Sequence, residues 1–90
     1  MELTDKFTIS PEAIARQVGD ETVILDLAGE AYFGLNRVGT RIWQLMDEGK
    51  TVSEICDALI EQYDVSRDQL EQDTLRLARN LAEKSLILPA

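Results

Sequence analysis

The chain has 90 residues, with 17 acidic and 9 basic side chains, and its formal net charge at pH 7 is −8. It contains no histidine and a single cysteine, Cys56. This composition excludes Ser-His-Asp or Cys-His catalysis, an internal disulfide and a zinc site built from Cys and His. The acidic balance disfavours binding to nucleic-acid phosphates and to anionic membranes. The sequence shows neither a signal peptide nor a run long enough to span a membrane. We therefore expect one cytoplasmic domain, residues 1–90, that binds a partner without catalysing a reaction and needs neither cofactor nor metal.

Strand signals occupy the first part of the chain. Phe7–Ile9 is a short alternating run that stops at a Ser-Pro pair, because proline cannot donate to a sheet ladder. Alternation resumes over Ala13–Val18, and a Gly-Asp turn leads to Thr22–Leu27, which is apolar and rich in β-branched residues. A short connection containing glycine precedes the third strand, Ala31–Leu35. Such short links join antiparallel neighbours, so the sequence predicts a three-stranded meander.

Two amphipathic helices are predicted next. Asn36 is placed to cap the first helix, and Gly49 to end it. Thr51 and Glu54 match a capping box at the start of the second helix. The apolar stripes are Val38, Ile42, Leu45 and Met46 in the first helix, and Val52, Ile55, Cys56, Leu59, Ile60 and Tyr63 in the second. Their spacing places each set on one helix face. We expect Trp43, beside the first stripe, and Cys56 to belong to the core.

A third helix is predicted over residues 67–84. Ser66 and Gln69 match a second capping box. The predicted helix face consists of Leu70, Thr74, Leu77, Leu81 and Ser85. The apolar tail Leu86–Leu88 either covers the core or adds a short strand. The order of elements predicts an α+β domain, with a three-stranded antiparallel sheet followed by three helices in a winged helix-turn-helix-like arrangement.

Four runs of the sequence resemble the PqqD-like family. They are Val23–Leu27, Tyr32–Asn36, Val38–Trp43 and Gly49–Ile55. This family contains relatives of the small peptide chaperone of pyrroloquinoline-quinone biosynthesis. It also contains leader-peptide recognition domains of lasso-peptide and other ribosomal-peptide pathways. The resemblance extends from about Ala13 to Leu88. It implies the winged-helix-like fold that the order of elements also predicts.

The resemblance implies a RiPP recognition element, where RiPP denotes a ribosomally synthesised and post-translationally modified peptide. Such a domain binds the leader of a precursor peptide and presents the peptide to a modifying enzyme, such as a leader peptidase, a cyclase or a radical SAM enzyme. The leader adds as a strand to the third strand, in a groove walled by the third helix. Carried onto this chain, the peptide-binding residues are Ala31, Tyr32, Phe33, Gly34, Leu35, Asp73, Arg76, Leu77, Asn80 and Leu81.

One stretch departs from part of the family. Members that serve quinone biosynthesis carry a Pro-Glu-Gly element before the third strand, whereas this chain has Leu27-Ala28-Gly29-Glu30. The departure favours the wider family, including lasso-peptide systems.

The predicted meander gives a physical reason for peptide binding. Its third strand is an edge unless the C-terminal tail covers it, and an edge is a template for another chain. A DNA-binding winged helix or another protein-interaction module is the alternative. The charges of the third helix balance, however, and recognition of DNA normally requires a basic helix. An acyl carrier protein fits less well, because neither serine in the nearest contexts, Ser66 or Ser85, lies in an Asp-Ser-Leu sequence.

Overall fold

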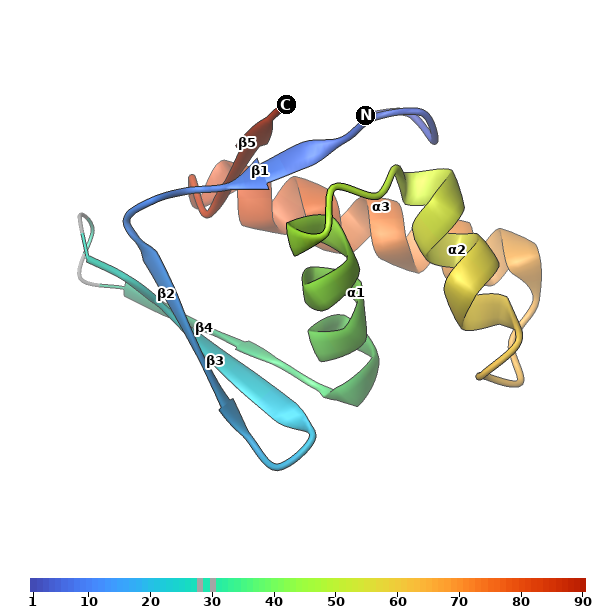
Figure 1. Ribbon diagram of the computed structural model, residues 1–90, viewed down its shortest axis with the longest axis horizontal. Coiled ribbons are helices and arrows are strands. Elements are labelled where there is room, and N and C mark those ends of the chain that lie inside the picture. Colours follow the sequence, from blue (N-terminus) through green and yellow to red (C-terminus); the bar gives the residue numbers. More distant parts are fainter. Residues whose placement is uncertain (28, 30) are drawn as a thin grey trace.

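The fold consists of five strands and three helices in a computed structural model that describes residues 1–27, 29 and 31–90 (Figure 1). In chain order the elements are β1 (Phe7–Ile9), β2 (Ala13–Val18), β3 (Glu21–Asp26), β4 (Ala31–Leu35), α1 (Arg37–Asp47), α2 (Val52–Ile60), α3 (Arg67–Glu83) and β5 (Ile87–Pro89). The predicted α+β class, with a three-stranded antiparallel sheet followed by three helices, is confirmed. In the predicted connection before β4, Ala28 and Glu30 lie outside the described residues.

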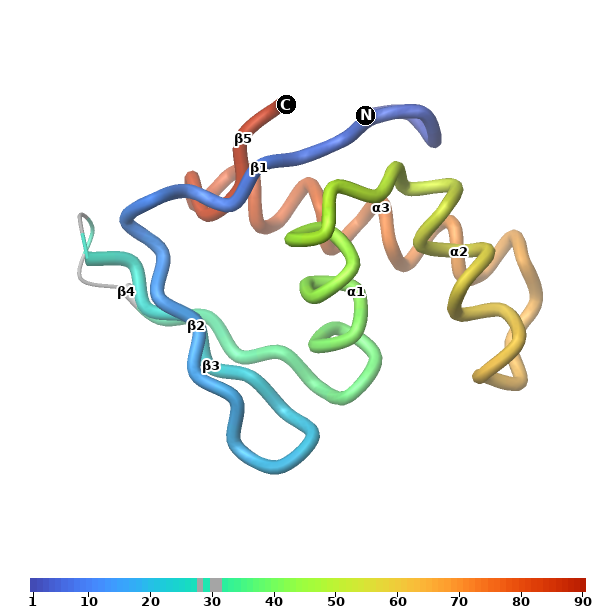
Figure 2. The backbone as a smooth tube through the Cα atoms, in the orientation of Figure 1, coloured from blue at the N-terminus to red at the C-terminus, as the bar shows by residue number. Residues whose placement is uncertain are grey.

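The strands form two separate sheets. The larger sheet has the order β2-β3-β4, and both of its pairings are antiparallel. The smaller sheet pairs β1 with β5, with Ile9 opposite Ile87. Figure 2 shows the two chain ends running together in this pair, apart from β4. The C-terminal tail therefore adds a strand, but to β1. Within the described part of the chain, β4 has β3 as its only strand neighbour and is an edge.

The larger sheet has one buried face and one exposed face. On β3, Thr22 and Ile24 are buried while Val23 and Leu25 are exposed, which is the alternation of a half-buried strand. Helix α1 contacts β3 and β4 on the buried side. We call the side with Ile24 the inner face and the side with Leu25 the outer face.

A continuous apolar core joins all three helices to both sheets. Its buried residues are Phe7, Ile24, Leu35, Ile42, Trp43, Leu45, Met46, Val52, Ile55, Cys56, Leu59, Leu70, Ala78, Leu81, Leu86 and Ile87. The predicted core positions of Trp43 and Cys56 are confirmed, with 6% and 0% of their surface exposed. Because α1, α2 and α3 all contribute to this core, their positions relative to the sheet are fixed together.

Local hydrogen bonds begin the helices where the sequence predicts. Asn36 Oδ1 accepts from the Gly39 N–H at 2.8 Å and caps α1. The capping box of α2 is complete: Thr51 Oγ1 accepts from the Glu54 N–H at 3.1 Å, and the Thr51 N–H donates to Glu54 Oε1 at 2.8 Å. This second bond is the main reason that the pKa of Glu54 is lowered.

The capping box predicted for α3 is only half present. Ser66 Oγ accepts from the Gln69 N–H at 3.1 Å, as expected. The Gln69 side chain instead donates to Asp73 Oδ1 at 2.8 Å. Asp73 lies one turn further along the helix, where its carboxylate is an accessible acceptor. Ser66 therefore caps α3, but Gln69 does not complete the predicted capping box.

Helix α2 is shorter than its apolar stripe indicates. It ends at Ile60, so Tyr63 lies in the link to α3 and not on the helix. Arg67 then ties the start of α3 to α2: its guanidinium donates to Asp57, to Glu71 and to the Ser53 carbonyl. The hydrogen bonds to Asp57 and Glu71 raise the pKa of Arg67, so this tie keeps its positive charge.

The chain reverses direction sharply after α3. Ser85 has a φ of 59°, the left-handed conformation that ends many helices. The Ser85 N–H donates to the Ala82 carbonyl at 3.0 Å, and the Leu86 N–H donates to the Leu81 carbonyl at 2.9 Å. Leu86 and Leu81 are both buried, which completes a Schellman motif. Ser85 is therefore a turn residue, and its predicted place on the α3 face is wrong.

The left-handed turn at Ser85 gives a stability prediction. Left-handed backbone costs an L-residue about 1–2 kcal/mol, and glycine avoids this cost while losing more chain entropy on folding. We expect Ser85→Gly to raise the free energy of unfolding by about 0.5–1 kcal/mol, measured by urea denaturation. Ser53→Gly, in the first turn of α2, is the control and should lower it by about 0.5–1 kcal/mol, because glycine is a poorer helix former and the variant loses the hydrogen bond that the Ser53 hydroxyl accepts from Arg67. A loss of stability in Ser85→Gly would contradict this account of the turn.

Candidate functional site

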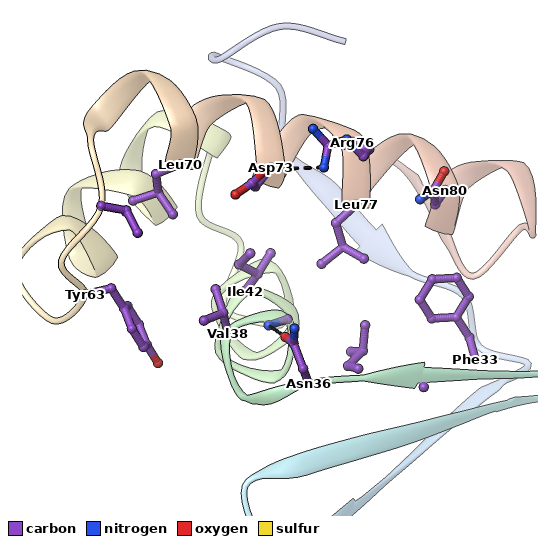
Figure 3. Close-up of a pocket in the computed structure, with 14 residues that line it drawn as sticks. Phe33, Asn36, Val38, Ile42, Tyr63, Leu70, Asp73, Arg76, Leu77 and Asn80 are labelled. Carbon is purple, nitrogen blue, oxygen red and sulfur yellow. Dashed lines mark hydrogen bonds and ion pairs between the residues drawn. The ribbon is translucent and has the colours of Figure 1, made fainter.

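A groove of about 520 Å³ lies between β4, α1 and α3 (Figure 3). It is lined by Phe33, Gly34, Leu35, Asn36, Val38, Gly39, Ile42, Tyr63, Val65, Leu70, Asp73, Arg76, Leu77 and Asn80. Its size is within the range of sites that enclose parts of a ligand. The groove runs beside the edge strand, so a ligand in it has access to both apolar side chains and backbone groups.

Strand β4 supplies one wall of the groove. Phe33 pairs with Ile24 across the sheet and shares its inner face, and Leu35 likewise shares the inner face with Thr22. Between them, Gly34 pairs with Val23 in unbroken register, so no bulge occurs there. A Cβ at Gly34 would meet no atom within 4 Å beyond its chain neighbours, so packing within the described residues does not require glycine there. Without a side chain, this position offers its backbone to a partner with little obstruction.

Helix α3 supplies the opposite wall. Leu70, Asp73, Leu77 and Asn80 recur at helical spacing and share one face. Figure 3 shows Leu77 extending from α3 toward the groove, opposite β4 and the start of α1. The Asp73 carboxylate is paired with Arg76 at 3.3 Å. Since Asp73 and Arg76 compensate each other, this wall presents apolar side chains without a net charge.

An aromatic ring stands at each end of the groove (Figure 3). The Lys84 ammonium lies 5.9 Å from the centre of the Phe33 ring, and the Arg37 guanidinium lies 5.9 Å from the centre of the Tyr63 ring. Both distances are within the range of cation–π attraction. The groove thus has apolar ends with a basic group over each ring, in a chain whose net charge is −8.

The structure brings seven of the ten predicted site residues together at this groove. They are Phe33, Gly34, Leu35, Asp73, Arg76, Leu77 and Asn80. Ala31 is the first residue of β4. Tyr32 belongs to the outer face and is 77% exposed. Leu81 is fully buried in the core, one helical turn from Leu77.

Sequence reasoning missed the contribution of α1 and of the link between α2 and α3. The additional lining residues are Asn36, Val38, Gly39, Ile42, Tyr63, Val65 and Leu70. Val38 could have been identified from the sequence, because it is the first residue of the apolar stripe of α1 and lies a full turn before the next residue of that stripe. Tyr63 and Val65 could also have been identified, because they are apolar residues in a short loop.

The lining of the groove is mostly apolar. Asp73 is its one carboxylate among the described lining residues, and it is paired. Cys56 lies outside the groove, where burial raises the pKa of its thiol. In the described ranges, no cluster of three or more His, Cys, Asp or Glu residues is arranged to hold a metal. No described helix combines the length and apolar character that a membrane crossing needs.

The chain is similar to a known family and to two solved structures. Residues 21–87 match the family of coenzyme PQQ synthesis protein D (PqqD). TbiB1, solved in complex with the TbiA(beta) leader peptide, is 42% identical and has a TM-score of 0.84, over 89% of this chain and 93% of that one. Lasso peptide synthetase B1, complexed with the leader peptide, is 28% identical with a TM-score of 0.85, over 93% and 99%. Among curated proteins, none matches the sequence.

The contrast between Leu77 and Leu81 separates groove from core. Leu81 is fully buried, so Leu81→Ala should lower the free energy of unfolding by about 2–5 kcal/mol. Leu77 is only half-buried, so Leu77→Ala should lower it by about 1 kcal/mol or less. Urea denaturation of both variants measures the difference. Equal losses of unfolding free energy would show that Leu77 is a core residue and that this face of α3 does not line an open groove.

Proposed function

Since the chain belongs to the family of coenzyme PQQ synthesis protein D, we propose that it binds the leader segment of a ribosomally synthesised precursor peptide and delivers that peptide to a modifying enzyme. The protein itself catalyses no reaction in this proposal. The observation that carries it is the edge of β4, which no other described strand pairs with and which lies beside an apolar groove. The two similar structures, both complexes with leader peptides, support the same assignment.

In the proposed complex the leader lies extended along β4 as a fourth strand. An edge strand offers unpaired N–H and C=O groups, and strand addition uses them for affinity while pockets select side chains. Alternate side chains of the leader would enter the groove between β4 and α3. Gly34 favours this arrangement, because it has no side chain that could obstruct a neighbouring strand.

Main-chain pairing alone does not give useful affinity. Each hydrogen bond contributes about 0.5–1.5 kcal/mol net, while ordering each leader residue costs about 1–2 kcal/mol of backbone entropy. Micromolar binding requires about −8 kcal/mol. Each apolar leader side chain buried against Phe33, Leu77 or Tyr63 adds about 1.5–3 kcal/mol. About three to five such side chains are therefore needed to reach micromolar binding.

The charges of α3 favour a peptide over DNA. Arg67 is engaged with Asp57 and Glu71, and Arg76 is paired with Asp73. Two of the three guanidinium groups of α3 are compensated in this way, so the helix offers little to phosphates, and the chain as a whole repels them. We therefore retain the peptide as ligand and treat duplex DNA as a negative control.

The precursor class that we favour is a lasso peptide. One similar structure is a lasso peptide synthetase B1, and the stretch Leu27–Glu30 lacks the Pro-Glu-Gly element of members that serve quinone biosynthesis. Under this proposal the partner enzyme acts on a lasso precursor.

Leu77 provides a direct test of leader binding. In Leu77→Asp a carboxylate replaces an apolar groove side chain, and desolvating it should weaken leader binding at least tenfold while the domain stays folded. Isothermal titration with the leader peptide encoded beside this chain measures the affinity, and amide NMR shifts should concentrate in β4 and α3.

The control for Leu77 is Leu88→Asp, an exposed leucine on β5 outside the groove. It should bind the leader as the unchanged chain does. Failure of the unchanged chain to bind at hundreds of micromolar would refute the proposal for that leader, and so would full affinity in Leu77→Asp.

Strand addition itself is tested on the peptide. In an antiparallel or parallel ladder, only alternate residues of the added strand direct their N–H groups toward β4. Two leader peptides N-methylated at alternate sets of residues should therefore differ: one set should lose at least tenfold in affinity and the other much less. Fluorescence anisotropy measures both. Equal losses would exclude a strand paired along β4.

A further inference from the structure

The two cations at the ends of the groove have no acidic partner within the described part of the chain. The Lys84 ammonium lies 5.9 Å from the centre of the Phe33 ring. The Arg37 guanidinium lies 5.9 Å from the centre of the Tyr63 ring. Neither cation belongs to one of the described ion pairs. A ring attracts a cation without using up its N–H groups, so both side chains keep donors for a ligand.

The charge at the groove has the opposite sign to the charge of the whole chain. The described lining of the groove contains one carboxylate, Asp73, and Arg76 compensates it. With Lys84 and Arg37 at the ends, three basic groups stand against one acidic group, in a chain whose net charge is −8. This local reversal of sign draws an anionic segment to the groove and away from the rest of the surface.

The stretch between the two cations is apolar. Figure 3 shows Val38, Ile42 and Leu77 between the rings of Tyr63 and Phe33. A leader that pairs with β4 and continues past the start of α1 would bury its apolar side chains in this stretch. The leader residues that flank the buried side chains would then lie beside the two cations. A carboxylate at either place gains a charge-assisted hydrogen bond to an ammonium or a guanidinium.

We propose that the leader segment bound here is an apolar stretch with an Asp or Glu on each side, and that Lys84 and Arg37 bind those two carboxylates. The inference rests on the proposed function and names the chemistry of its ligand. Apolar contacts alone leave the register of an added strand open, because a shift by two residues directs side chains to the same face again. An acidic residue held at each end removes this freedom. The two cations therefore determine which residues of the leader lie in the groove.

The test removes both cations and compares the result with a control that loses the same charge. The variant is Arg37→Gln/Lys84→Gln, and the control is Arg16→Gln/Arg79→Gln, which changes two exposed side chains outside the groove. Fluorescence anisotropy measures the affinity of each for the leader peptide encoded beside this chain. At about 0.01 M salt we expect the variant to lose about 5–20-fold and the control less than about twofold. At about 1 M salt, where the Debye length is about 3 Å, this difference should largely disappear.

The leader provides the second half of the test. Each Asp and Glu of the peptide is replaced in turn by Asn or Gln. One acidic residue on each side of the buried segment should cost about two- to fivefold in affinity when it is replaced. The cost of replacing one of them should vanish in Lys84→Gln, and the cost of replacing the other should vanish in Arg37→Gln.

Circular dichroism melting confirms that each variant is folded, and Lys84→Gln, with Arg79→Gln as its control, serves if the double variant is not. Equal affinity of the folded variant and its control would overturn the inference. A leader that binds without an acidic residue on either side of its buried segment would also overturn it. Failure of the leader to bind the unchanged chain would instead refute the proposed function.

Discussion

The free edge of β4 is the constraint on which the rest of the molecule depends. β4 pairs with β3 on one side, and within the described residues no strand pairs with its other side. After the chain reverses at Ser85, β5 pairs with β1 and leaves this edge uncovered. The groove lies beside this open edge, with β4 forming one wall and α3 the opposite wall. An edge left open beside an apolar wall is what an extended peptide requires.

Local signals were sufficient for most of the fold. The caps at Asn36 and Thr51 join groups three residues apart, so the sequence alone indicates where their helices begin. The partner of β5 is a different matter. Ile87 pairs with Ile9 from the other end of the chain, and a three-residue apolar run carries no information about which edge it will join. Pairing between strands so far apart in the sequence is decided by tertiary packing.

Part of the site was also predictable from local patterns in the sequence. Strand alternation separates Phe33, which lines the groove, from Tyr32, which faces outward. Helical spacing, in contrast, places Leu77 and Leu81 on one stripe, and only the position of α3 against the core buries Leu81. Tyr63 continued the α2 stripe in sequence, yet α2 ends at Ile60 and leaves its ring at the end of the groove. An apolar stripe shows which residues of a helix are apolar, but it does not show which neighbouring element they contact.

The pairing of β1 with β5 has an architectural consequence. It brings the two ends of the described chain together, with the Ala90 N–H donating to the Lys6 carbonyl at 3.1 Å. Neither end lines the groove. Domains whose termini are adjacent tolerate insertion into other proteins. This fold is therefore suited to gene fusion: joined at either end, or inserted within a larger enzyme, it would keep β4 and the groove accessible. The same fold can thus serve as a separate subunit or as a module of a multidomain protein.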